Sequence, residues 1–230
     1  MTEGERISSF CRPGPRKVDV LFVVDDSSSM ADEAALLARN AAPFGHVLTA
    51  PDVGVDVRVA VTRGGARECG GELGALLDIT CRQRGEEFRT DVPSDGAPAA
   101  DVRADGCEAS CTLDAFGGPL PPPSLVDIPE SAGPPWLAEL HGQPSGLSRA
   151  PLADSLACLL PVGIGGCEQE SPLSAMLAAI ARSLDAEDPA YGWMREDASF
   201  FGVLITDEDE IDPQLPLIAA ARLRELLAFK

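Results

Sequence analysis

Three oxygen-bearing side chains, Asp25, Ser27 and Ser29, alternate within one short segment of the sequence, Asp-Asp-Ser-Ser-Ser. A carboxylate and two hydroxyls with this spacing can turn toward one point and offer hard oxygen ligands to a divalent cation. Mg²⁺ prefers such ligands in octahedral geometry and keeps several waters. We therefore expect a metal site here, in which a second carboxylate, Asp207, completes the charge balance.

The elements around these residues explain why Asp207 is expected beside Asp25. Residues 18–25 (VDVLFVVD) form a nearly unbroken apolar run, which is typical of a central parallel strand buried on both faces. Residues 199–206 (SFFGVLIT) form a second buried strand that leads directly into Asp207. Ligands of open α/β sheets bind at the carboxyl ends of the strands, so both acidic loops are expected at that same edge.

The rest of the pattern predicts an α/β fold with an open, mostly parallel central sheet flanked by helices. Alternation favours one more strand over 55–62, and helical patterning favours helices over 31–48, 151–160, 172–184 and 213–229. We expect an N-terminal tail over 1–16, followed by a single domain over 17–230.

Residues 64–146 interrupt this regular pattern with half of the prolines and many of the glycines. A structureless stretch of this length is unusual inside a compact domain. We interpret it as an irregular insertion, with a short strand or hairpin near 71–79 and disulfides that staple it. Its proline cluster at 119–123 is more typical of a rigid exposed linker than of a proline-recognition ligand.

Seven cysteines favour disulfides. Six of them form three pairs that are close in the sequence, with Cys11 left over: Cys69 and Cys81, Cys107 and Cys111, Cys158 and Cys167. Only Cys107 and Cys111 have a short metal-ligand spacing, and neither histidine of the chain is beside a cysteine. Three short-range disulfides are therefore favoured over a metal site or buried free thiols, and they indicate an extracytoplasmic or cell-surface location, although the first residues lack the apolar segment of a signal peptide.

The charge of the chain limits its partners. With 18 basic and 37 acidic residues the formal net charge is −19, which argues against nucleic acid and anionic membranes because both would repel the protein. The sequence contains no run of 18 apolar residues, so it predicts no membrane-spanning segment. A cationic partner or bound metal ions fit this charge better.

Three segments resemble the von Willebrand factor A domain family. VLFVVDDSSSM at 20–30 matches the Asp-x-Ser-x-Ser motif of the metal-ion-dependent adhesion site (MIDAS) of that family. VLITDEDE at 203–210 resembles the later strand that ends in Thr-Asp, and ESPLSAML at 170–177 resembles the loop and helix that carry the threonine of the site. Together with the paired cysteines, these motifs are similar to those of secreted bacterial A-domain proteins.

The resemblance implies a divalent-cation-dependent adhesion or interaction module with Mg²⁺, or Mn²⁺ or Ca²⁺, in its site. Asp25, Ser27 and Ser29 would bind the ion directly, whereas Asp207 and Ser171, which stands where the family has threonine, would bind directly or through water. Glu170 is a competing oxygen donor one residue from Ser171. An acidic side chain of a protein ligand would fill the open position. No base–nucleophile pair accompanies the site, so we do not expect an enzyme.

Three alternatives remain open. The serines and aspartate could be a helix N-cap, for which these residue types are preferred. An A-like scaffold without metal could pair through the insertion or through an open sheet edge. A full A domain carries two further strand–helix units after the Thr-Asp strand, whereas this sequence has one helix there, which implies either a truncated C-terminal part or a shortened sheet with an exposed edge. A receiver-like phosphoacceptor domain is less favoured, because it needs a lysine near the end of the fold and no lysine lies between 17 and 230.

Overall fold

A five-stranded sheet of order β6-β5-β2-β1-β7 forms the centre of the computed structural model. The structure describes residues 16–65, 72–90, 99–116, 134–140, 142–166, 168–209 and 215–227. The strands are β1 (Arg16–Val24), β2 (Val55–Arg63), β5 (Leu137–Leu140), β6 (Gln143–Gly146) and β7 (Ser199–Ile205). Strand β1 runs parallel to β2 and to β7, whereas the β5–β6 hairpin adds antiparallel to β2. The predicted α/β class with a mostly parallel sheet is confirmed.

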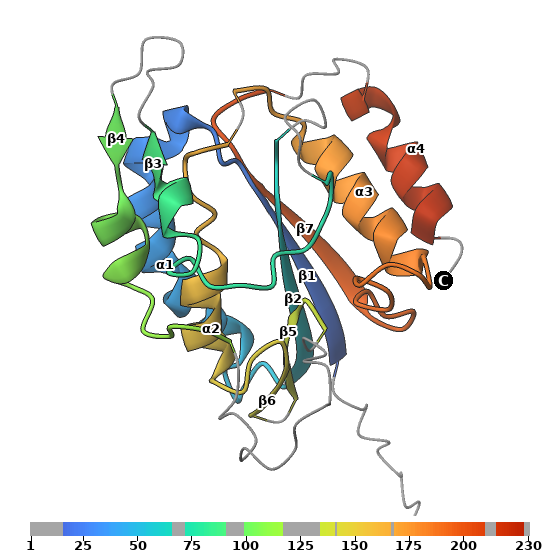
Figure 1. Cartoon of the computed structure of the whole chain (residues 1–230). Coiled ribbons are helices and arrows are strands. Elements are labelled where there is room, and N and C mark those ends of the chain that lie inside the picture. The colour runs from blue at the N-terminus through green and yellow to red at the C-terminus, as the bar shows by residue number, and fades with distance from the viewer. Residues whose placement is uncertain are drawn as a thin grey trace, which may run out of the picture.

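Helices cover both faces of this sheet. Figure 1 shows α1 (Ala31–Leu48) and α2 (Leu152–Leu159) on one side, and α3 (Pro172–Leu184) and α4 (Leu215–Leu227) on the other. Successive side chains of a strand point to opposite faces, so Phe22 of β1 packs in the core with α1 and α2, whereas Leu21 packs with α3. Burial on both faces explains why β1 is an almost continuous apolar run.

The predicted regular elements agree closely with the observed ones. The helices predicted over 31–48 and 172–184 have the bounds of α1 and α3, and α2, α4, β2 and β7 differ from their predicted bounds by two residues or fewer at each end. Pro43 lies inside α1 without ending it. In the described part of the chain, no helix combines the length and the apolar character needed to cross a bilayer.

The segment predicted as an irregular insertion contains several ordered pieces. Besides β5 and β6, which join the central sheet, it holds the short pair β3 (Arg89–Thr90) and β4 (Ala100–Asp101), a 3-10 turn, η3 (Gly85–Phe88), and a π-helical turn, η4 (Ala104–Glu108). Near 71–79, where a strand or hairpin was expected, the described residues contain one isolated bridge, between Thr62 and Leu76.

Two disulfides connect this segment internally and to α2, but not with the predicted short-range pairing. Cys81 bonds to Cys107, and Cys111 bonds to Cys158. The predicted pair of Cys107 with Cys111 is wrong, because each of them bonds to a cysteine of another segment. The predicted pairs of Cys81 with Cys69 and of Cys158 with Cys167 are wrong as well, because Cys81 and Cys158 have these other partners. Cys11, Cys69 and Cys167 lie outside the described residues. Two disulfides are typical of proteins from oxidising compartments.

Candidate functional site

The carboxyl ends of β1 and β7 bring the two predicted acidic loops together. The strands are adjacent and parallel, and their pairing continues one residue further, with the Asp25 amide donating to the Ile205 carbonyl at 2.9 Å. The Thr206 hydroxyl then donates to Oδ2 of Asp25 at 2.7 Å. Asp25 is therefore fixed from the neighbouring strand, by a threonine that the sequence analysis did not single out.

A chain of hydrogen bonds links the four residues first predicted as a metal site. The other carboxylate oxygen of Asp25, Oδ1, accepts from the Ser27 amide at 2.8 Å. The Ser27 and Ser29 hydroxyls are 2.8 Å apart, and Ser29 donates to Oδ1 of Asp207 at 3.1 Å. Two carboxylates and two hydroxyls from loops that are 178 residues apart thus form one polar cluster.

Helix capping does not explain these hydroxyls. The 3-10 turn η1 (Ser28–Met30) has Ser27 as its N-cap, and α1 has Met30, but neither side chain makes a capping hydrogen bond. Ser28 instead donates to Oε1 of Glu168 at 2.8 Å, from the loop that precedes α3. The serines of this loop bond to acidic side chains or to each other.

The loop before α3 supplies Glu170, which enters the floor of the cluster. The Ser171 amide donates to the Gly64 carbonyl at 2.8 Å, and Glu170 forms a bridge with Gly65. Glu170 is 1% exposed, and neither of its carboxylate oxygens has a hydrogen-bond partner. Ser171 is the N-cap of α3, yet its side chain makes no capping bond.

Gly64 is the residue that allows Glu170 to come this close. A Cβ atom at Gly64 would lie 2.5 Å from Oε2 of Glu170 and 3.5 Å from the Cα atom of Asp25. A Cβ atom at Gly65 would likewise lie close to acidic side chains, 3.4 Å from Oδ1 of Asp26 and 4.0 Å from Oε1 of Glu170. The two glycines at the end of β2 therefore leave room for the Glu170 carboxylate beside Asp25 and Asp26.

Burial and neighbouring charges change two pKa values in the site. Burial, and then the charges of Asp25 and Asp26, together raise the pKa of Glu170 to about 10, so Glu170 is protonated at neutral pH without a metal. Burial also raises the pKa of Asp26 to about 6, although the positive charge of Arg63 opposes this shift. Arg63 lies 3.6 Å from Asp26 and also pairs with Glu87.

The cluster has a buried floor and an exposed rim. Asp25, Ser27 and Glu170 are buried, whereas Ser29 and Asp207 are exposed. Beside the rim, a cavity of about 280 Å³ lies between α1 and the end of β7, lined by Met30, Glu33, Leu36, Leu37, Asn40, Ile205, Thr206 and Asp207. A ligand atom from another molecule can therefore reach the oxygens of the rim.

The carboxylates of Asp25, Glu170 and Asp207 do not form a ready three-acid metal cage. Within the described residues, one group of three histidine, cysteine or acidic ligand atoms lies within 4.8 Å of one another, and it consists of Cys81, Cys107 and Cys111. Comparisons with protein-family models, with curated proteins and with solved structures gave no match. Function must therefore be argued from the residues of the site.

Proposed function

We propose that this chain is a divalent-cation-dependent protein-binding module of von Willebrand factor A type. Asp25, Ser27 and Ser29 would hold Mg²⁺, or Mn²⁺ or Ca²⁺, together with Asp207, and Ser171 would contribute directly or through water. The observation that carries the proposal is the hydrogen-bonded chain from Asp25 to Asp207, in which the two serine hydroxyls serve no helix cap.

The donor set fits a hard divalent cation. Carboxylate and hydroxyl oxygens are the ligands that Mg²⁺ and Ca²⁺ select, and sites for Mg²⁺ keep several waters, so a full cage of carboxylates is not required. The buried Glu170 supports the same conclusion, because in its ionised form the carboxylate would be a buried charge to which no group donates a hydrogen bond, which is costly. A cation beside it would supply the missing partner.

The exposed rim supports a protein ligand with an acidic side chain. A bound cation whose outer positions face solvent is a Lewis acid that accepts a carboxylate from another molecule. The chain itself carries a net charge of −19 and repels acidic surfaces. Binding of an acidic partner would therefore depend on the metal, which makes the interaction sensitive to chelators.

A second candidate is an A-like scaffold that binds through its sheet edge without metal. Strand β7 is the last strand in the sheet order, and Phe201 on it is 56% exposed. An exposed strand edge with apolar side chains is a template for pairing with another chain. This candidate predicts binding that does not change when metal is removed.

The test is thermal unfolding with Mg²⁺ or Mn²⁺ compared with chelator. A ligand at 100 times its Kd stabilises the native state by about 2.7 kcal/mol. For a chain of this size that corresponds to a rise in Tm of about 5–10 °C. We expect the rise in the native sequence and its loss in Asp25→Ala.

Asp209→Ala is the matched control, because Asp209 is an exposed acid two residues beyond Asp207. It removes one negative charge close to the site without removing a proposed ligand, and the metal-induced rise in Tm should persist. Absence of any rise at millimolar metal in the native sequence would reject the metal site and favour the scaffold.

A further inference from the structure

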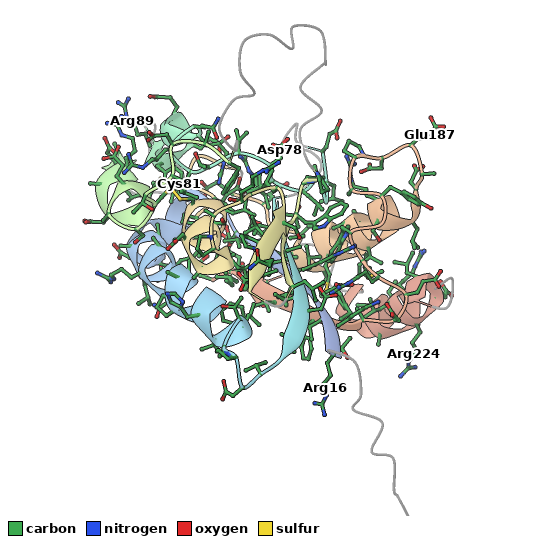
Figure 2. The ribbon with its side chains drawn as sticks, turned by 90° about the horizontal axis from the view of Figure 1, so that it is seen from below. Arg16, Asp78, Cys81, Arg89, Glu187 and Arg224 are labelled. Carbon is green, nitrogen blue, oxygen red and sulfur yellow. A yellow bond between two sulfur atoms is a disulfide. The ribbon has the colours of Figure 1, made fainter. Side chains whose placement is uncertain are left out.

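Four cysteines from three separate parts of the chain converge at one place, apart from the site at the strand ends. Cys81 follows the end of the segment near 71–79, Cys107 and Cys111 lie in and just after η4, and Cys158 lies in α2. The Sγ atoms of Cys81, Cys107 and Cys111 all lie within 4.8 Å of one another, and Cys158 is bonded to Cys111. The two disulfides are thus side by side. Figure 2 shows Cys81 on the side of the molecule that carries Arg89, far from Glu187.

Hydrogen bonds beside the disulfides also hold the three segments together. The Cys81 amide donates to the Cys158 carbonyl at 2.8 Å, and the Arg82 side chain donates to the Cys111 carbonyl at 2.8 Å. All four cysteines are buried in the core that α1 and α2 share with the sheet. The convergence therefore does not depend on the sulfur–sulfur bonds alone.

We propose that these four cysteines are also a metal site: when both disulfides are reduced, they bind one Zn²⁺ as a tetrathiolate. Four cysteines are the ligand set of many structural zinc sites, with Zn–S distances of about 2.3 Å. Tetrahedral geometry at that distance places the sulfurs roughly 3.8 Å apart. Three of the four sulfurs already lie within 4.8 Å of one another, and the fourth belongs to Cys158, which is bonded to Cys111.

The arrangement offers an entry path for an ion. A cavity of about 180 Å³ reaches the cluster and is lined by Cys81, Cys107, Arg82, Gly85, Arg103, Glu108 and Asp114. Arg82 pairs with Asp114, and Arg103 pairs with Asp101, so both arginines are already paired with acids.

The chemistry balances with a thiol or phosphine reductant as the electron donor. Each disulfide takes up two electrons and two protons and becomes two thiols, while the reductant is oxidised. The four thiols then release four protons as Zn²⁺ binds. Oxidation by a disulfide oxidant reverses both steps, releases Zn²⁺ and restores the pairs Cys81–Cys107 and Cys111–Cys158.

The test uses Co²⁺ as a spectroscopic substitute for Zn²⁺ on the full chain, with excess Mg²⁺ present so that oxygen-ligand sites are not counted. After reduction and removal of the reductant without air, we expect one Co²⁺ per chain. Its visible absorption should be the intense pattern of a tetrahedral thiolate site, and Zn²⁺ should displace it. The oxidised protein should not show this absorption.

Two cysteine variants locate the site. Cys107→Ser removes one ligand, and it should lose the tetrathiolate absorption, whereas Cys11→Ser, which leaves the four cysteines intact, should keep it. The proposal is overturned if the reduced native sequence shows no such absorption, if Cys107→Ser retains it, or if Cys11→Ser loses it equally. None of these results bears on the Mg²⁺-dependent rise in Tm, so the two metal proposals are tested independently of each other.

Discussion

Glu170→Gln should stabilise the metal-free protein at neutral pH. Glutamine has nearly the shape of the protonated glutamic acid but needs no proton. The pKa of Glu170 is raised from 4.5 to about 10 in the folded chain, so at pH 7 folding must take up a proton from solution. The substitution removes that requirement.

The size of the effect follows from proton linkage. Between pH 4.5 and about 10, Glu170 binds more protons in the native state than in the unfolded state. The part of the free energy of unfolding that depends on this proton is therefore fully present below pH 4.5 and is lost as the pH rises toward 10. The interval from 4.5 to pH 7, at about 1.4 kcal/mol per pH unit, gives at most about 3.5 kcal/mol.

The assay is urea unfolding in chelator at pH values from 5 to 8, for the native sequence and for Glu170→Gln. The free energy of unfolding should fall with pH less steeply in the variant, by up to about 1.4 kcal/mol per pH unit. Glu187→Gln is the control, because Glu187 is an exposed glutamate of a distant loop, and its slope should equal that of the native sequence (Figure 2).

The same variant tests the role of Glu170 toward a metal. If a cation pairs with the ionised carboxylate, the metal-induced rise in Tm should be smaller in Glu170→Gln than in the native sequence. A variant with an unchanged pH slope, or one less stable than the native sequence at pH 7, would refute the reasoning. Either result would mean that Glu170 is ionised in the metal-free fold.

Two further substitutions test how the fold and the site are held. Arg195→Ala should cost about 3–5 kcal/mol in urea unfolding, because Asp19 is fully buried and accepts from Arg195 at 2.9 Å, whereas Arg224→Ala, at an exposed position of α4, should cost little (Figure 2). Gly64→Ala should leave the metal-free Tm nearly unchanged but reduce its rise with Mg²⁺, because the new methyl group displaces the flexible Glu170 carboxylate. Gly85→Ala, with no atom closer than 4.0 Å to its Cβ, is the control and should respond to Mg²⁺ like the native sequence.

The sequence was informative where burial and strand order decide the structure. Strand β1 could be predicted because both of its faces are covered, and the contact between the loops that carry Asp25 and Asp207 followed from the parallel direction of β1 and β7. The hydroxyl of Thr206 could have been found by the same reasoning, since it immediately precedes Asp207 in the loop that faces Asp25.

Other features depend on contacts that sequence spacing does not contain. Strands β5 and β6 are four residues each, and β6 includes Pro144, so neither shows the alternation or apolar run of a strand. The disulfides join residues 26 and 47 positions apart, whereas close spacing favoured the wrong pairs. The burial of Glu170 depends on Gly64 and Gly65, which come from a different strand end.

Charge balance in the candidate site determines how the proposed cation would respond to pH. Arg63 is the positive charge that opposes the pKa shift of Asp26, but it is shared with Glu87, so its charge serves two acids at once. Glu170 is kept neutral by a proton instead, and Asp25 depends on donated hydrogen bonds from Ser27 and Thr206. A proton on Glu170 and a divalent cation among these oxygens relieve the same repulsion, so they compete. Raising the pH removes the proton and should strengthen the stabilisation by metal, which distinguishes a cation site from an acidic cluster that protons alone keep neutral.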